Sequence, residues 1–321
     1  MQVSLVMPTW NAGPLLEEVL TAVDRQPGAD QLERVAIDSG SRDDTVACLR
    51  RHGFQVETIP QSEFDHGATR DRAIERCRGE IIVLLTQDAT PANSEWLPRL
   101  LESYADPKVA AAYCKQIPRP DCNPVLAARL AEWTAGKDTP VVQQVADAAE
   151  FAALPPLERL ARAAYDNVAG SVRRSAWEQL RFGRRAFGED VAFGKRALLA
   201  GWKLVFQARS VVIHSHNRSP RAEGRRIYCD HKNLAELFDL HTLPDRQALR
   251  AAIAWGREHF GKLVAGLGLP AAQTRRLHEW AMDYAWWSAV GQYLGGNAAR
   301  LQRGPLGWVF RWADRWLARG I

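Results

Sequence analysis

The chain has 321 residues, of which 46% are hydrophobic and 25% are charged, and its formal net charge is +5. This ordinary globular composition is enough for one large domain with an extension or for two domains. The mild positive charge favours anionic partners without choosing among phosphates, lipid headgroups and nucleic acid. The sequence contains neither a basic leader with an apolar signal core nor an apolar run near the ~20 residues of a spanning helix. We therefore expect neither secretion nor membrane insertion.

The five cysteines are odd in number and show no Cys-x-x-Cys spacing. Neither a zinc cluster nor a disulfide framework is therefore indicated, and we expect a reducing, cytoplasmic setting.

The first predicted strand spans residues 2–8, and a helix follows over residues 15–23. Residues 33–39 form a second predicted strand that closes at Asp38. Because ligands bind beyond the carboxyl ends of strands in open α/β sheets, the Asp38 carboxylate is positioned to accept the imide N–H of a pyrimidine base. Ser41 and Asp44 have the spacing of a capping box, which predicts a helix start at Ser41.

A third predicted strand covers residues 54–59, and a helix over residues 67–78 carries Arg70 and Arg72 near its start. Cations at a helix N-terminus oppose the macrodipole, so a purely structural reason for them is weak. A bound diphosphate would supply a reason, since arginine pairs bidentately with phosphate and the helix start adds backbone donors.

Five consecutive apolar residues, 81–85, predict a buried central strand that stops at Thr86-Gln87-Asp88. This places the Asp88 carboxylate just past the end of that strand, as a candidate for a metal or phosphate site. The alternative is that Asp88 caps a turn before Pro91.

The alternation of strands and helices predicts an α/β fold with a mostly parallel central sheet flanked by helices. No Gly-x-Gly-x-x-Gly follows the first strand and no Walker lysine loop is present. This argues against a dinucleotide dehydrogenase and against a P-loop NTPase. We find no chemistry in residues 123–160, which we expect to form helices and loops beside the sheet.

Two further groups of polar residues follow later in the chain. Glu189 and Asp190 lie in the first turn of a predicted helix, where they either stabilise the helix start or act on a substrate, with Asp190 as a general base. His214 and His216 lie just past an apolar strand, at a spacing that projects both side chains to one side. They either form ordinary structural hydrogen bonds or ligate a metal or contact phosphates.

The last third of the chain is helical by its pattern, and seven of the twelve tryptophans fall after residue 250. A final predicted helix covers residues 306–319. Three of these tryptophans, Trp308, Trp312 and Trp316, lie with Val309 and Leu317 on one stripe of this helix, and its arginines lie off that stripe. The stripe either touches an anionic membrane surface or packs on the catalytic domain or a second subunit. We predict a catalytic domain over residues 1–232 and a helical Trp-rich region over residues 233–321.

Taken together, these stretches resemble the family 2 glycosyltransferases of the GT-A fold, and within them the bacterial rhamnosyltransferases. The resemblance covers roughly residues 2 to 232, and the ordered set of motifs is more specific than any single one. The matching stretches are Val6-Met-Pro-Thr-Trp-Asn-Ala12, Ile37-Asp-Ser-Gly-Ser-Arg-Asp-Asp-Thr45, Phe64-Asp-His-Gly-Ala-Thr-Arg70, Leu85-Thr-Gln-Asp-Ala89, Phe187-Gly-Glu-Asp190 and Val212-Ile-His-Ser-His-Asn217.

The resemblance implies an inverting transferase that uses a divalent cation, Mg²⁺ or Mn²⁺, and moves L-rhamnose from dTDP-L-rhamnose to a glycan or glycolipid hydroxyl. Such an enzyme would work in cell-envelope polysaccharide biosynthesis, in the cytoplasm or at the inner face of the cytoplasmic membrane. Asp190 would be the catalytic base with Glu189 beside it, and His214 or His216 would complete the metal or phosphate shell. Nucleotide-sugar contacts are implied for Pro8, Thr9, Asp38, Arg70, Gln87 and Asp88, the last also as a metal ligand.

One position departs from the family pattern, because Thr86 replaces the first aspartate of the Asp-x-Asp metal motif. A single carboxylate still suits Mg²⁺, which keeps several waters, but metal affinity without nucleotide should be weak. Thr86 is also the main support for a non-catalytic membrane-surface scaffold of the same fold. A family 2 transferase with another donor, such as a UDP-hexose, is the nearest alternative among enzymes. We expect no nucleic-acid binding, since no motif for it is present.

Overall fold

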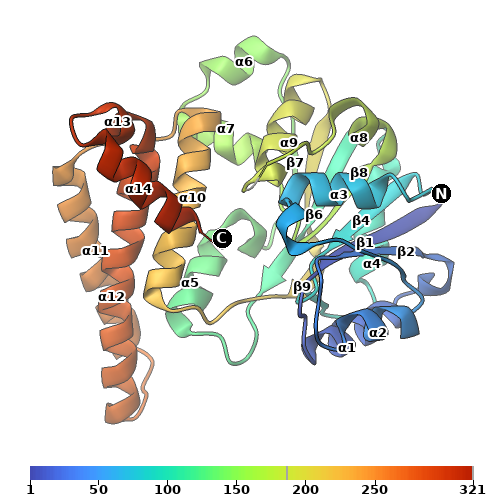
Figure 1. Ribbon diagram of the computed structural model, residues 1–321, viewed down its shortest axis with the longest axis horizontal. Helices are drawn as coiled ribbons and strands as arrows, with labels where there is room; N and C mark the ends of the chain where they lie inside the picture. Colours follow the sequence, from blue (N-terminus) through green and yellow to red (C-terminus); the bar gives the residue numbers. More distant parts are fainter. Residues whose placement is uncertain (186, 320–321) are drawn as a thin grey trace. The chain divides into compact units, whose positions relative to one another are not determined.

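The computed structural model describes residues 1–185 and 187–319. The chain divides into two compact units, one made of residues 1–121 and 129–215 and the other of residues 122–128 and those from 216 onward. Within the described residues, the first unit contains the whole β-sheet and the second unit is helical (Figure 1).

The sheet of the first unit has nine strands in the order β3-β2-β1-β4-β8-β6-β9-β5, and β7 pairs with β9. The pairs β1/β2, β1/β4, β2/β3 and β6/β9 are parallel, whereas β8 runs antiparallel between β4 and β6. The strands are β1 (Val3–Thr9), β2 (Glu33–Asp38), β3 (Gln55–Thr58), β4 (Ile81–Leu85), β5 (Thr90–Pro91), β6 (Val109–Ile117), β7 (Val141–Gln143), β8 (Ala169–Arg173) and β9 (Lys203–Ile213).

The reversed direction of β8 matters for the site. β8 starts where β4 ends, since Ala169 pairs with Leu85. The residues that precede β8 therefore reach the same edge of the sheet as the residues that follow β1, β2 and β4. The expected α/β fold is confirmed, but the sheet is mixed.

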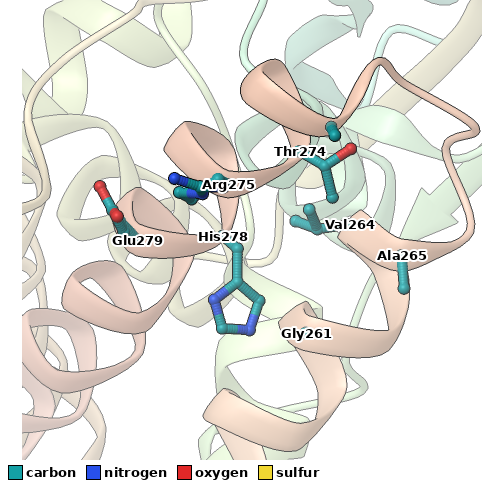
Figure 2. A pocket seen from close by; sticks show the side chains of 8 residues that line it. Gly261, Val264, Ala265, Thr274, Arg275, His278 and Glu279 are labelled. Carbon is teal, nitrogen blue, oxygen red and sulfur yellow. The ribbon is translucent and has the colours of Figure 1, made fainter.

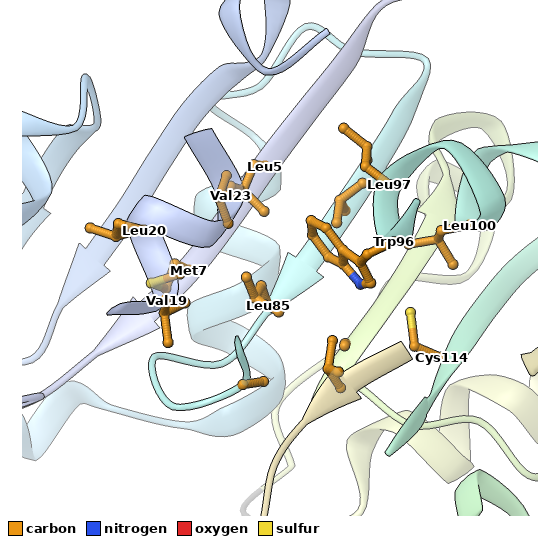
Figure 3. Close-up of a cluster of buried hydrophobic side chains, with 14 of the residues drawn as sticks. Leu5, Met7, Val19, Leu20, Val23, Leu85, Trp96, Leu97, Leu100 and Cys114 are labelled. Carbon is orange, nitrogen blue, oxygen red and sulfur yellow. The ribbon is translucent and has the colours of Figure 1, made fainter. Parts of the chain in front are cut away.

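The helix α1 packs on this sheet because it presents an apolar stripe to it. In α1, every residue at the inner positions is buried, and these side chains form one cluster with β1, β4 and Trp96 of α4 (Figure 3). The helices of the first unit are α1 (Leu15–Asp24), α2 (Thr45–Arg51), α3 (His66–Ile74), α4 (Trp96–Glu102), α6 (Ala148–Ala153), α7 (Pro156–Ala163), α8 (Arg174–Leu180) and α9 (Glu189–Leu199); α5 (Pro124–Glu132) is divided between the units.

The predicted capping box at Ser41 is wrong. The helix α2 begins four residues later, at Thr45, with Asp44 in the N-cap position. Ser41 does not cap α2, because its Oγ accepts from the Asn11 amide at 2.7 Å while its hydroxyl donates to Asp38 Oδ2 at 2.5 Å.

The second unit consists of α10 (Pro220–Phe238), α11 (Arg246–Ala265), α12 (Ala271–Gly296), α13 (Ala298–Arg303) and α14 (Gly307–Ala318) in the described part of the chain. Glycines let α10 and α12 touch through their backbones. A Cβ added at Gly291 or at Gly295 would lie 2.3 Å from a carbonyl oxygen of α10, that of Gly224 or Tyr228 respectively. The domain boundary that we expected at residue 232 lies inside α10. Because α10 packs on α12, the whole of α10 belongs to the second unit, and the two compact units divide near residue 215.

The stripe predicted for the final helix is divided between two environments. Leu317 is buried, and the ring of Trp316 lies under the guanidinium groups of Arg221 and Arg225, at 4.7 and 5.4 Å. Trp308 and Trp312 are 68% and 62% exposed. None of the helices among the described residues combines the length and apolarity needed to cross a membrane.

Candidate active site

A cavity of about 260 Å³ opens at the carboxyl ends of β1 and β4 in the first unit. These parallel strands end at the same edge, so the loops that follow them converge there. Four of the predicted nucleotide-sugar residues line it, namely Pro8, Thr9, Arg70 and Gln87. The other lining residues are Trp10, Ser39, Gln61, Phe64, His66 and Thr86.

Asp38 is not among the residues that line this cavity. Its side chain is fully buried, and its oxygens accept hydrogen bonds from the Gly40 and Ser41 amides and from the Ser41 and Thr9 hydroxyls. These bonds occupy the carboxylate that we expected to face a pyrimidine base. Asp38 therefore shapes the loop after β2, whereas Ser39, whose buried Oγ has no partner among the described residues, lines the cavity.

The Gln87 side chain bonds to the backbone of Trp10, another residue that lines the cavity. Its Oε1 accepts from the Trp10 amide at 2.8 Å, and its Nε2 donates to the Trp10 carbonyl at 3.1 Å. The loops after β1 and β4 are therefore joined by one side chain. Thr86 is also occupied, because its amide and hydroxyl both donate to the Val168 carbonyl, at 2.9 and 3.3 Å.

Arg70 brings a buried positive charge to the cavity. Its helix α3 starts at His66 with Asp65 as N-cap, whose carboxylate accepts from the Ala68 amide. One guanidinium nitrogen, Nη1, lies 3.0 Å from Glu189 Oε1 and donates to the His66 carbonyl at 2.9 Å. In the described structure, the buried Nε of Arg70 has no hydrogen-bond partner. A buried unpaired donor is costly, so an anion in the cavity would be stabilised there.

Asp88 and His214 lie next to each other past the ends of β4 and β9. The Asp88 Oδ1 and His214 Nε2 atoms are 3.6 Å apart, and both side chains are largely buried. Arg119 holds the turn that carries Asp88 by donating to the Asp88 carbonyl and to the Thr90 hydroxyl. A carboxylate oxygen and an imidazole nitrogen at this separation fit two positions of one divalent-cation shell. His216 follows two residues later and is the first residue of the second unit's C-terminal segment.

The predicted acids Glu189 and Asp190 begin α9. Glu189 is buried against Arg70 and also accepts from Asn167 Nδ2 at 3.3 Å. Asp190 is half-buried, with the Asn167 amide 3.4 Å from its Oδ2. Burial first, and then the nearby carboxylates of Glu189 and Asp166, raise the pKa of Asp190 well above the ordinary aspartate value. A carboxylate with a raised pKa is a stronger base.

Three residues of this region were missed in the sequence: Gln116, Asp166 and Asn167. Asp166 and Asn167 precede β8 and reach the site only because that strand is antiparallel. Gln116 lies near the end of β6, in a run that reads as an ordinary buried strand. Burial raises the pKa of Asp166, while the Val168 amide, His214 and the Gln116 amide oppose this rise.

Another group with metal-binding side chains lies between α1 and α2. Glu17, Cys48 and His52 place ligand atoms within 4.8 Å of one another. However, Arg51 already pairs with Glu17 at 2.9 Å, and His52 also bonds to it, so that the pKa of Glu17 is lowered to about 2. The charges in this group are balanced without a cation.

The second unit has its own hollow of about 410 Å³ between α11 and α12 (Figure 2). Its wall combines Val264 and Ala265 of α11 with Thr274, His278 and Glu279 of α12. This mixture of small apolar and opposed charged groups does not define a particular ligand.

Solved structures share this fold. A crystal structure of Staphylococcus aureus TarS 1-349 aligns with 95% of this chain and 93% of its own, at a TM-score of 0.52 and 14% identity. Mycobacterium tuberculosis glucosyl-3-phosphoglycerate synthase, solved with Mn²⁺, UDP-glucose and phosphoglyceric acid, aligns with 76% of this chain and 81% of its own, at a TM-score of 0.52 and 18% identity. The mixed sheet with its flanking and C-terminal helices is thus the GT-A glycosyltransferase fold.

Sequence comparisons identify the family of glycosyltransferases to which this chain is similar. The model of Glycosyl transferase family 2 matches residues 4–141. The O-antigen chain rhamnosyltransferase RfbN of Salmonella typhimurium is 33% identical over 233 residues, which are 71% of each chain. The O-antigen chain rhamnosyltransferase WbaN of Salmonella anatum is 32% identical over 229 residues, 70% of each chain. This chain belongs to glycosyltransferase family 2, as its motifs predicted, and it is a glycosyltransferase.

Proposed function

We propose that this chain is an inverting rhamnosyltransferase that moves L-rhamnose from dTDP-L-rhamnose to a hydroxyl of a cell-envelope glycan or lipid-linked acceptor. The observation that carries the proposal is Arg70, a buried arginine that lines the cavity where β1 and β4 end and whose Nε has no hydrogen-bond partner in the described structure. A diphosphate there would be stabilised by the positive charge of Arg70 and would accept hydrogen bonds from its guanidinium group. The names of the two Salmonella relatives support rhamnose as the sugar.

Asp88 and His214 would hold a divalent cation, Mg²⁺ or Mn²⁺, with His216 as a third candidate. When bound, the cation would stabilise the charge that develops on the departing diphosphate. Arg70 would orient the same diphosphate from the α3 side, and the floor of the cavity, which Asp38 shapes, would hold the base.

Asp190 would act as the general base. The acceptor oxygen forms a bond to the anomeric carbon while its proton passes to an Asp190 oxygen. The bond between that carbon and the phosphate oxygen breaks, and the electron pair leaves with dTDP. A single displacement of this kind inverts the anomeric centre. Glu189 is engaged by Arg70 and Asn167, so it would hold the loop rather than the proton.

The proposal is tested by calorimetric titration of the protein with dTDP, UDP, GDP and ADP, each with Mg²⁺ and with a chelator. We expect the tightest binding for dTDP with metal, and an Asp88→Ala variant should lose the metal-dependent part of this affinity. Exposed Asp30→Ala, outside the site, is the control. A preference for UDP would mean another donor sugar, and absence of nucleotide binding would favour a non-catalytic scaffold.

We also propose that the exposed tryptophans of α14 touch an anionic membrane surface. Trp308 and Trp312 lie one helical turn apart, and Leu306 beside them is exposed as well. Arg311 and Arg315 on the same helix are exposed. Aromatic side chains next to arginines suit the headgroup region of a bilayer that contains anionic lipid, where a lipid-linked acceptor would be found. The enzyme would then work in the cytoplasm, at the inner face of the membrane.

A further inference from the structure

The Gln116 side chain joins His214 to Asp166. Its Oε1 lies 2.8 Å from His214 Nδ1, and its Nε2 lies 2.6 Å from Asp166 Oδ2. The residue is 5% exposed and is held in the sheet, where it pairs with Val212 of β9. The His214 backbone amide donates to the Ile117 carbonyl at 2.9 Å, so the histidine extends the same pairing. Gln116 and His214 are therefore both held by the pairing of β6 and β9.

The direction of the bridge follows from the chemistry of its ends. The other Asp166 oxygen, Oδ1, accepts from the Val168 amide at 2.7 Å. Gln116 Nε2 donates to Asp166 Oδ2, so the amide nitrogen of Gln116 faces Asp166. The Gln116 carbonyl oxygen then faces His214, and this oxygen can only accept.

A neutral imidazole next to such an acceptor carries its proton on Nδ1. Its other nitrogen, Nε2, then holds the lone pair, and this is the atom 3.6 Å from Asp88 Oδ1. Only a nitrogen with a free lone pair can bind a cation, and the hydrogen bond on the other ring nitrogen decides which one that is.

We propose that Gln116 and Asp166 are positioning residues that fix the tautomer and ring orientation of His214, so that its Nε2 is ready to bind a divalent cation together with Asp88. The inference rests on the proposed function only for the role of the cation. It assigns no catalytic step to either residue. Asp166 acts through Gln116, and Gln116 acts through His214.

A solely structural role for Gln116 would have different consequences. If the amide only fills space in the sheet, a side chain of similar size should preserve metal binding. If it sets the tautomer, a side chain without an acceptor should change the imidazole and the metal affinity together. Gln116→Met makes this change with little change in volume.

The matched control is Gln207→Met. Gln207 is also buried at 5% exposure, lies on the neighbouring strand β9, and bonds to Ser103 rather than to the site, with its Nε2 3.4 Å from Ser103 Oγ. Both variants remove one buried amide from the same sheet, so a general effect on folding should appear in both.

The first measurement is a long-range ¹H–¹⁵N correlation spectrum of metal-free protein with ¹⁵N-labelled histidine, at about pH 8, above the ordinary histidine pKa of about 6.5. A His214→Gln variant identifies the His214 signals. We expect the Nδ1–H tautomer in the native protein and in Gln207→Met. Gln116→Met should contain the Nε2–H tautomer. An Nε2–H tautomer in the native protein would overturn the proposal, even if the variants do not fold.

The second measurement is Mn²⁺ binding in the presence of dTDP, followed by the electron paramagnetic resonance of free Mn²⁺. Gln116→Met should weaken binding by about 10- to 100-fold, which is typical for a lost partner behind a ligand. Gln207→Met should bind as the native protein does, and unchanged binding in Gln116→Met would overturn the proposal. If the native protein shows the expected tautomer but binds no Mn²⁺, the proposed metal role fails while the positioning of His214 stands.

Discussion

Arg70 of α3 and Glu189 of α9 form a buried ion pair, in which Nη1 and Oε1 are 3.0 Å apart and each side chain is 6% exposed. The pair joins a residue of the cavity at the ends of β1 and β4 to the helix that carries Asp190. The pair also gives the two adjacent acids different charge environments. Glu189 is neutralised by Arg70, whereas Asp190 lies near other carboxylates. The difference between their partners gives different expectations for their removal.

Replacing Glu189 with alanine should lower the free energy of unfolding by about 3–5 kcal/mol, because it leaves the Arg70 charge buried without a partner. Urea denaturation would measure the change. Glu178→Ala is the matched control, since Glu178 is exposed and its contact with Arg174 is 4.0 Å long. An exposed pair of this kind contributes no more than about 1 kcal/mol. Equal losses in the free energy of unfolding of the two variants would show that the buried pair contributes no more to stability than the exposed pair.

Asp190→Asn should reduce the transfer rate by about 10²- to 10⁴-fold, since it removes the proposed general base without changing the shape of the side chain. The affinity for dTDP, measured by calorimetry, should stay close to that of the native protein. Asp44→Asn, at the exposed start of α2, should change neither quantity. Loss of nucleotide binding in Asp190→Asn would place Asp190 in the donor site instead.

The same substitution should change how stability depends on pH. An acid whose pKa is raised by folding stabilises the protein below its unfolded pKa, and this contribution is lost as pH rises through the folded pKa. The pKa of Asp190 is raised by burial and by neighbouring acids, so its ionisation at neutral pH costs stability. Asn has no such cost.

We therefore expect Asp190→Asn to melt at a higher temperature than the native protein at pH 8. The difference should shrink as pH falls toward about 4, the ordinary pKa of aspartate. Thermal unfolding followed by circular dichroism between these values checks the trend. An offset that does not vary with pH would contradict it.

Gly67→Ala should disturb the α3 start, because a Cβ at Gly67 would lie 1.9 Å from the Gly183 carbonyl oxygen and 3.4 Å from Glu189 Cβ. We expect a loss of about 1–3 kcal/mol, as for other overpacked sites, together with weaker dTDP binding through Arg70. Gly261→Ala in α11 is the control, since the atoms nearest to its added Cβ are 3.7 Å away. Alanine there should stabilise the helix by up to about 1 kcal/mol.

Replacing Trp308 and Trp312 with serine should reduce sedimentation with vesicles that contain anionic lipid, and it should leave dTDP affinity unchanged. The two side chains are the most exposed tryptophans of α14. Trp133→Ser, an exposed tryptophan outside this helix, is the control for a general loss of aromatic surface. If the double variant sediments as well as the native protein, α14 does not bind lipid.

Local patterns predicted the strands β1, β2 and β4 and the side chains that follow them, because each strand has an apolar run that ends at a polar residue. The family resemblance implied nucleotide-sugar contacts for Thr9, Arg70 and Gln87, and these three residues line one cavity. The roles of all these residues are still predictions.

Other features depend on contacts that no local pattern records. The direction of β8 is set by its pairing with β4 and β6, and it alone brings Asp166 and Asn167 to the site. Asp38 looked available to a base, but its partners Gly40 and Ser41 fold back on it and occupy its oxygens. The helical period placed Trp316 with Trp308, although two arginines of α10 cover Trp316 while Trp308 is exposed.

The insertion of β8 between β4 and β6 also constrains the order in which the molecule can be assembled during synthesis. A ribosome completes β4 and β6 well before it reaches residue 169, and these two strands do not pair with each other. β4 and β6 therefore lack their shared neighbour until β8 has been synthesised. Pairings between strands so far apart in the sequence also form slowly. The residues that line the cavity are synthesised first, whereas Glu189, Asp190 and His214 are synthesised after β8. A growing chain thus contains the residues that line the cavity before it contains Glu189 and Asp190.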